Sequence, residues 1–231
     1  SIWDTNPNTV NITDNVWRDN GYTGLNLNSS QGTISGNTFI DTRTIVVEDP
    51  DYYFGDYQSG ILLASANFAL SITNNTFDNV HYGVVMYESV DGVVTISNNT
   101  FDGTIINSVR ASGSQSGGDL DDVTIENNAF TNYAGEGEQV SNTRDDNQQP
   151  QTLIVNCNWW GQTSGPVEVQ VGTGVDATTW LLPDDLENPL CYGGVSSTLL
   201  NEDFDDELTL YDEDANEVWS TDRYAHSALE S

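Results

Sequence analysis

The apolar positions along this chain fall into a unit that recurs six times. In each copy an Ile or Val precedes an Asn by three residues, and a Phe or Trp follows the same Asn by two residues. A polar residue held between two apolar positions in every copy is typical of a solenoid, in which each repeat stacks on the one before it. The six copies are Ile12-Asn15-Trp17, Ile34-Asn37-Phe39, Ile72-Asn75-Phe77, Ile96-Asn99-Phe101, Ile125-Asn128-Phe130 and Val155-Asn158-Trp160.

Each copy predicts three short strands. The residues before the Asn alternate between apolar and polar side chains, as in Val10-Asn11-Ile12, and this alternation is the period of a half-buried strand. The aromatic residue after the Asn points inward again, and a third apolar stretch such as residues 83–87 follows. We therefore expect a core stack formed by Trp17, Phe39, Phe77, Phe101, Phe130 and Trp160.

The Asn of each copy is expected at the corner between the first two strands. Asn tolerates the left-handed backbone conformation that a sharp corner requires. Stacked Asn side chains can also hydrogen-bond from one layer to the next. This pattern predicts a structural Asn ladder of Asn15, Asn37, Asn75, Asn99, Asn128 and Asn158.

The spacing of the Asn positions predicts coils of constant size with loops of variable length. Successive positions lie 22, 38, 24, 29 and 30 residues apart, so 22 residues complete one coil and the excess forms loops at the corners. The prediction is an all-β parallel solenoid of about six coils across residues 1–166. Residues 167–195 predict an apolar cap, with a strand over residues 167–171. Residues 196–231 predict an acidic tail or β-hairpin that packs on the solenoid or on a neighbouring subunit.

Two motifs give the repeats a resemblance to a known family. The sequence Ile-x-Asn-Asn-Thr-Phe occurs at residues 72–77 and 96–101, and Asn158-Trp159-Trp160-Gly161 is followed by Ser164-Gly165-Pro166. Residues 8–166 therefore resemble the right-handed parallel β-helix of pectate-lyase-like surface proteins, in which the second motif closes a coil near the end of the array. The resemblance implies a right-handed solenoid. It implies no single activity, because lyases, hydrolases, epimerases, adhesins and structural fibres share such repeats.

The charge balance is strongly acidic. The chain carries 36 Asp and Glu against five Arg and no Lys, which gives a formal net charge of -31. Such a charge disfavours nucleic acid and anionic membranes as partners, and no apolar run reaches the roughly 18 residues that span a bilayer. Because the Debye length is only about 3 Å at 1 M salt, brine would screen the self-repulsion. We infer a salt-loving microbe as the source, with an ordinary acidic secreted protein as the alternative.

The cysteines and sequons point to an extracellular location. Cys157 and Cys191 are the two cysteines of the chain, and a disulfide that ties the cap to the last coil is expected in preference to reactive thiols. This disulfide indicates an oxidising compartment, and we expect a secreted protein. Four Asn-x-Ser/Thr sequons are candidate glycosylation sites, at Asn11, Asn28, Asn74 and Asn98.

Acidic and aromatic residues gather in the longest insertion, between the second and third Asn positions. Aromatic faces and carboxylates suit a sugar-binding cleft, and the carboxylates alone could hold a hard cation such as calcium. A loop that only covers the side of the solenoid fits the same residues. The candidate ligand residues are Asp49, Asp51, Tyr52, Tyr53, Asp56 and Tyr57.

No catalytic residue is nominated by the sequence. Asp119, Asp121 and Asp122 form a second acidic group and are weak candidates for a metal site, but no other cofactor is expected. Lyases of the resembled superfamily typically abstract a proton with a Lys or Arg beside calcium, whereas Lys is absent here. Arg110 lies on an expected strand, where a guanidinium is a salt-bridge partner more often than a base.

Two functions fit these features. The leading interpretation is a secreted, non-enzymatic structural or adhesive solenoid at a microbial cell surface. It would stack end to end into a filament, or contact other surface proteins, by offering a strand to an exposed sheet edge. The alternative is a protein that binds a polysaccharide, or cleaves one as a lyase or hydrolase.

Overall fold

The computed structural model describes residues 8–21, 23–28, 30–41, 58–65, 69–87, 92–112, 120–135, 138–143, 151–182, 191–193, 210–211 and 218–219. The chain divides into two compact units, residues 1–194 and residues 195–231. The first unit contains the repeats.

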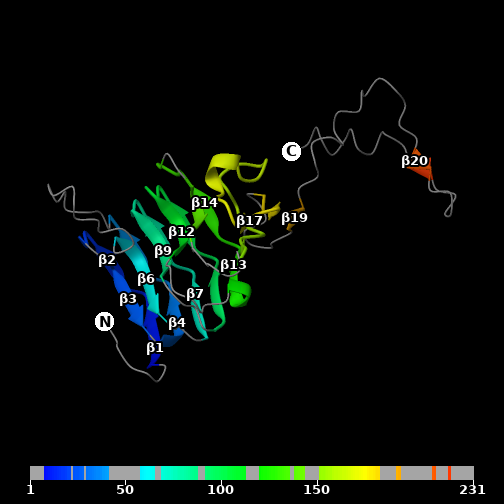
Figure 1. Cartoon of the computed structure of the whole chain (residues 1–231). Coiled ribbons are helices and arrows are strands. Elements are labelled where there is room, and N and C mark those ends of the chain that lie inside the picture. The colour runs from blue at the N-terminus through cyan, green and yellow to red at the C-terminus, as the bar shows by residue number, and fades with distance from the viewer. Residues whose placement is uncertain are drawn as a thin grey trace. The chain divides into compact units, whose positions relative to one another are not determined.

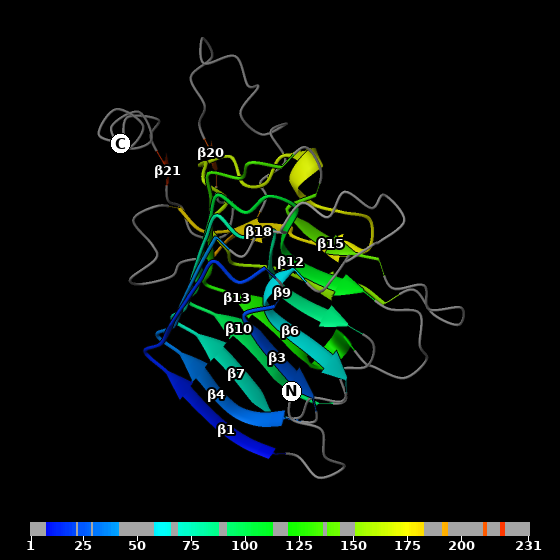
Figure 2. The same cartoon turned by 90° about the vertical axis from the view of Figure 1, so that its left-hand side faces the viewer.

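Three parallel sheets are formed by the strands of the repeats, and each coil contributes one strand to each sheet. The first sheet holds β1 (Asn8–Thr13), β4 (Ser30–Ser35), β7 (Leu70–Thr73), β10 (Val94–Ser97) and β13 (Val123–Glu126), which lie side by side in Figure 2. The second holds β2 (Val16–Arg18), β5 (Thr38–Ile40), β8 (Thr76–Asp78), β11 (Thr100–Asp102) and β14 (Ala129–Thr131). The third holds β3 (Leu25–Asn28), β6 (Ser59–Ser65), β9 (Tyr82–Tyr87), β12 (Asn107–Ser112) and β15 (Val140–Asn142).

The predicted all-β parallel solenoid is confirmed. Equivalent positions of successive coils are in register, since Ile34 faces Ile12 on one side and Ile72 on the other. Five coils are complete within the described residues, and their colours run in order from blue to green in Figure 1. The sixth coil is reduced to β16 (Leu153–Ile154) and to single bridges at Trp159 and Val171.

Hydrogen bonds join the six asparagines of the Asn ladder from coil to coil. Each of the first five donates its backbone N–H and its Nδ2 to the Oδ1 of the next, over 2.9–3.1 Å. From Asn37 onward, each Nδ2 also donates to the backbone carbonyl of the Ile in the preceding coil. Asn15 is exposed and the other five are buried, so the ladder supplies the partners that buried amides need.

The left-handed residue of each corner is the one before the ladder Asn. No ladder Asn is among the described residues with positive φ, so the expectation that the Asn itself takes this conformation is wrong. The preceding residue makes the bend, and the Asn keeps its amide directed at the neighbouring coils. These preceding residues have φ between 55 and 68° and are Asp14, Gly36, Asn74, Asn98, Asn127 and Cys157.

The six aromatic side chains stack along the core, with ring centroids 4.6–5.2 Å apart. A column of glycines makes room for the rings, because a Cβ on Gly60 would lie 2.7 Å from Cδ1 of Phe77. In the fourth coil the column continues as Ser108, in register with Gly83. The first three ring pairs are parallel to within 10°, whereas the pairs that involve Phe130 are tilted by 31 and 42°. The tilt thus begins where the glycine column ends.

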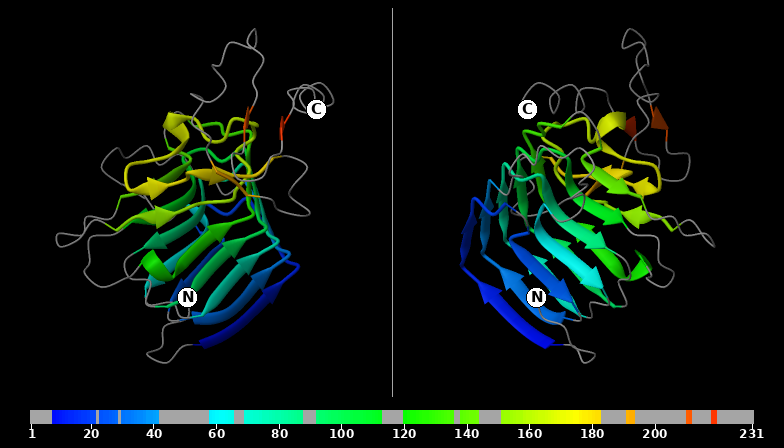
Figure 3. Two further views of the ribbon diagram at one scale, coloured as in Figure 1. Left: turned by 90° about the vertical axis from the view of Figure 1, so that its right-hand side faces the viewer. Right: turned by 60° about the vertical axis from the view of Figure 1, so that its left-hand side comes forward.

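A truncated seventh coil closes the end of the solenoid opposite β1 (Figure 3). β17 (Val175–Asp176) pairs in parallel with β16, and Trp180 forms a parallel bridge with Asn158. The backbone N–H of Leu181 donates to the carbonyl of Asn158 over 3.0 Å, as Trp159 donates to Asn128 one coil earlier. Trp180 therefore occupies the seventh ladder position, and the ladder ends at Asn158.

The strand expected over residues 167–171 is wrong. Residues Glu168–Gln170 form a short 3-10 helix, η3. Gln170 explains the difference, because its Oε1 accepts the backbone N–H of Val167 over 2.9 Å and its Nε2 donates to Oε1 of Gln139 over 3.0 Å. These side-chain bonds replace the backbone bonds of a strand, and Val169 is left 66% exposed.

A disulfide joins Cys157 to Cys191, with the two Cα atoms 5.0 Å apart. Cys157 is the left-handed corner residue of the sixth coil. Cys191 immediately precedes β19 (Tyr192–Gly193), which pairs antiparallel with β18 (Thr179–Trp180). The disulfide thus ties the last ladder corner to the strand that flanks the truncated seventh coil.

The second unit, residues 195–231, contains one described strand pair. β20 (Leu210–Tyr211) pairs antiparallel with β21 (Val218–Trp219). In the part of the chain that the structure describes, no helix has the length and apolar character needed to cross a membrane.

Candidate functional site on the outer face of the third sheet

The candidate ligand loop of the sequence lies outside the described residues. Asp49, Asp51, Tyr52, Tyr53, Asp56 and Tyr57 belong to residues 42–57, which connect β5 to β6. The chain therefore enters the third sheet directly after this loop.

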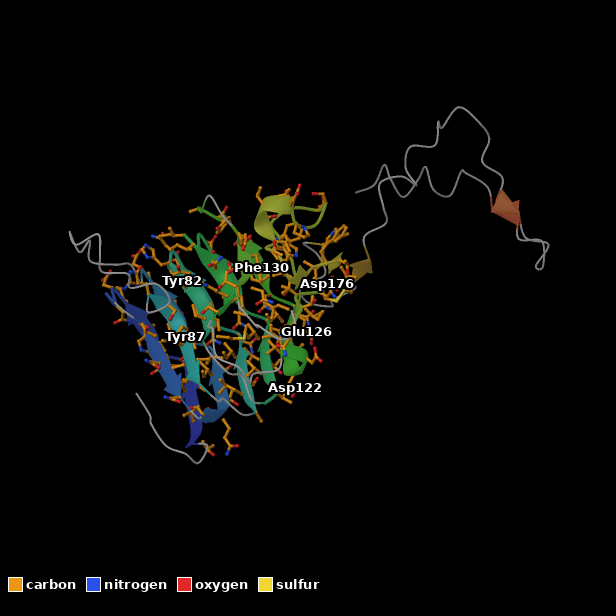
Figure 4. The ribbon with its side chains drawn as sticks, viewed as in Figure 1. Tyr82, Tyr87, Asp122, Glu126, Phe130 and Asp176 are labelled. Atoms are coloured by element: carbon orange, nitrogen blue, oxygen red, sulfur yellow. A yellow bond between two sulfur atoms is a disulfide. The ribbon has the colours of Figure 1, made fainter. Side chains whose placement is uncertain are left out.

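The candidate metal residues are only partly described. Asp119 lies outside the described residues, while Asp121 and Asp122 are exposed in the 3-10 helix η2 (Leu120–Asp122). Figure 4 shows Asp122 near Glu126, away from Tyr82 and Tyr87 of β9. No group of three or more His, Cys, Asp or Glu suited to hold a metal ion occurs among the described residues.

A second apolar cluster lies on the outer face of the third sheet. Leu62 and Val85 face each other across β6 and β9, and the residues on either side of each belong to the inner core. Because side chains alternate along a strand, Leu62 and Val85 point outward. They are nevertheless 1% and 0% exposed, and Tyr82 is buried with them. This strip is a covered surface, with Tyr87 partly exposed at its margin.

Arg110 of β12 continues this strip in the next coil, in register with Val85. Its guanidinium carbon lies 5.6 Å from the ring centroid of Tyr82, which is a cation–π distance. Its Nη1 donates to Oη of Tyr82 over 3.2 Å, and its Nη2 donates to Oγ1 of Thr143 over 3.3 Å. The guanidinium is thus held at the outer face by aromatic and hydroxyl partners.

Sequence reasoning missed Leu62, Tyr82 and Val85, although the signal was present. Residues 60–63 and 83–87 are unbroken apolar runs and do not alternate. A strand that is buried on both faces has this pattern. The runs therefore predicted a covered outer surface.

The four sequons differ in accessibility. Asn11, Asn74 and Asn98 are exposed, whereas Asn28 is 6% exposed. The other described arginine, Arg18, is exposed on β2.

Comparison with known proteins identifies the family. A family description of a right-handed β-helix region matches residues 1–130 of the 231 residues. The chain belongs to the right-handed β-helix family. No curated protein and no solved structure matches it. As a right-handed β-helix protein, it has a fold consistent with a surface protein or a polysaccharide-related protein.

Proposed function

We propose that this right-handed β-helix protein is a secreted structural or adhesive solenoid at the surface of a salt-loving microbe, and that its subunits join end to end into a filament. The observation that carries the proposal is the Asn ladder. It runs without interruption from Asn15 to Asn158, beside an uninterrupted aromatic stack. Such continuous bonding along the axis suits a load-bearing rod.

The two ends of the Asn ladder differ, and this difference supports an asymmetric joint. At the first coil, no described residue donates to Oδ1 of Asn15, and Trp17 and Ile12 are only partly buried. At the last coil, Trp180 pairs with Asn158 in a parallel bridge and takes the next ladder position. Because Trp180 has no carboxamide, the Asn ladder cannot run without a break from one copy into the next.

A strand from another segment is the better candidate for the joint. The edge strands of the three sheets at the first coil are β1, β2 and β3. Unpaired backbone groups at such an edge accept an added strand. The second unit, residues 195–231, contains strand-forming sequence, and we propose that it pairs with this edge of a neighbouring subunit.

Light scattering tests the proposed joint. The full chain should form large assemblies in molar salt, and a variant that ends at Gly194 should stay monomeric. Circular dichroism of both proteins checks that the solenoid is folded. A full chain that remains monomeric at high concentration would refute the filament.

Polysaccharide binding is the second candidate function. It is favoured by the fixed guanidinium of Arg110 and by the aromatic Tyr87 on the same outer face. A glycan screen should then show binding of an acidic polysaccharide that weakens in Arg110→Gln, while Arg18→Gln on β2 serves as the matched control. Equal binding by both variants would remove the outer face of the third sheet as the site.

A further inference from the structure

Two sequons occupy the same corner in adjacent coils. In Asn74-Asn75-Thr76 and Asn98-Asn99-Thr100 the middle residue belongs to the Asn ladder. The two threonines face each other in the register of β8 and β11. The first residue of each sequon is the left-handed corner residue, with φ of 55° in both cases. The fold therefore presents both sequons in one conformation.

The corner places the acceptor amides outside the solenoid. Asn75 and Asn99 are buried, whereas Asn74 and Asn98 directly before them are exposed. The carboxamide of Asn74 makes no hydrogen bond to another described residue. Nδ2 of Asn98 lies 3.5 Å from Oγ of Ser97, at the outer limit of a hydrogen bond. Neither amide is used to hold the fold together.

The sequon at Asn28 provides a contrast within the same chain. Asn28 is 6% exposed, and Ser30 is fully buried and donates its Oγ to the carbonyl of Asn28 over 3.2 Å. In the folded protein this sequon is closed. All three sequons fit the Asn-x-Ser/Thr pattern. The acceptor Asn is exposed in two of them and buried in the third.

We propose that Asn74 and Asn98 are sites of N-linked glycosylation. The donor is a lipid-linked oligosaccharide. A bond forms between Nδ2 of the Asn and the anomeric carbon of the sugar, and the bond from that carbon to the phosphate oxygen breaks. The lipid phosphate leaves with the oxygen, and the amide loses one proton. Neighbouring strands are about 4.8 Å apart, so two sugars on this pair crowd each other and most molecules carry one.

This modification goes beyond the proposed structural role, because it holds whether the solenoid forms filaments or binds a polysaccharide. Polar glycans on one corner would cover that side of the rod. They would increase the hydration of the outer surface at this corner, to which the buried Asn ladder and aromatic stack contribute nothing.

Peptide mass spectrometry of the protein secreted by its native cell tests the proposal. Glycopeptides should contain Asn74 or Asn98, and the peptide with Asn28 should be unmodified. In the same cell, Thr76→Val together with Thr100→Val should remove the mass added to the peptides that contain Asn74 and Asn98 and leave the ladder asparagines in place. Ser30→Ala, which removes the Asn28 sequon, should leave the mass of the glycan unchanged. Unmodified Asn74 and Asn98, or equal occupancy at Asn28, would overturn the assignment.

Discussion

Asn75 donates its backbone N–H and its Nδ2 to the same oxygen, Oδ1 of Asn99, over 2.9 and 3.0 Å. The carboxamide of Asn99 therefore links two coils by two hydrogen bonds. Its Nδ2 in turn donates to Oδ1 of Asn128 in the next coil. The Asn ladder thus adds side-chain hydrogen bonds between successive coils to the backbone hydrogen bonds of the three sheets.

Asn99→Ala should lower the free energy of unfolding by about 2–4 kcal/mol. It leaves the buried backbone N–H of Asn75 unpaired, takes one acceptor from Nδ2 of Asn75, which keeps the carbonyl of Ile34, and removes the bonds that the Asn99 amide donates. Asn15→Ala is the matched control, since Asn15 is exposed and accepts from no described residue. Its cost should stay below about 1 kcal/mol. Urea unfolding measures both. Equal costs would contradict a ladder whose strength lies in its buried interior.

Gly60→Ala should cost about 1–3 kcal/mol, because the added Cβ would lie 2.7 Å from the ring of Phe77 in a packed core. Ser108→Ala is the control at an equivalent position two coils later, where the core already accommodates a side chain. It should cost about 1 kcal/mol through the lost hydrogen bond to Thr104. If thermal unfolding shows both substitutions to be neutral, the glycine column is not needed for the parallel rings.

Removal of the disulfide should destabilise the first unit. The bond closes a segment of 34 residues, for which loop-closure entropy predicts about 3–4 kcal/mol. A reductant should therefore lower the Tm of the natural protein. The double variant Cys157→Ser with Cys191→Ser should have a low Tm that the reductant does not change. A natural protein with the same Tm in both conditions would show that the cap is held without the disulfide.

Salt should stabilise the protein. The formal charge of -31 opposes compaction, and salt screens this repulsion. The urea midpoint should rise steadily when NaCl is raised from about 0.1 M to about 2 M. A matched titration with sucrose separates charge screening from general exclusion of the solute. A midpoint independent of NaCl would argue against adaptation to brine.

Much of this fold could be predicted from the sequence because every ladder position requires the same chemical group, a side-chain amide that both donates and accepts. Every coil needs an amide at the same place, so Asn recurs. The left-handed corner requires only a backbone conformation, and Asp14, Gly36 and Cys157 all satisfy it. No shared residue type marks that position, and it was assigned to the wrong residue.

The end of the solenoid was harder to predict for a related reason. Trp180 follows Asn158 by 22 residues, the same step that separates Asn15 from Asn37. The 22-residue spacing therefore continues for one more coil, but a pattern defined by Asn does not detect a coil that has Trp at this position. The outer strip of Leu62 and Val85 shows the other limit, because an apolar run indicates burial on both faces and does not identify the covering segment.

Electron microscopy of the purified chain in molar salt tests the proposed function most directly. The account predicts filaments whose subunits repeat along the solenoid axis, with fibre diffraction at about 4.8 Å from the stacked coils. Single compact particles at every concentration, with no filaments in salt, would contradict it.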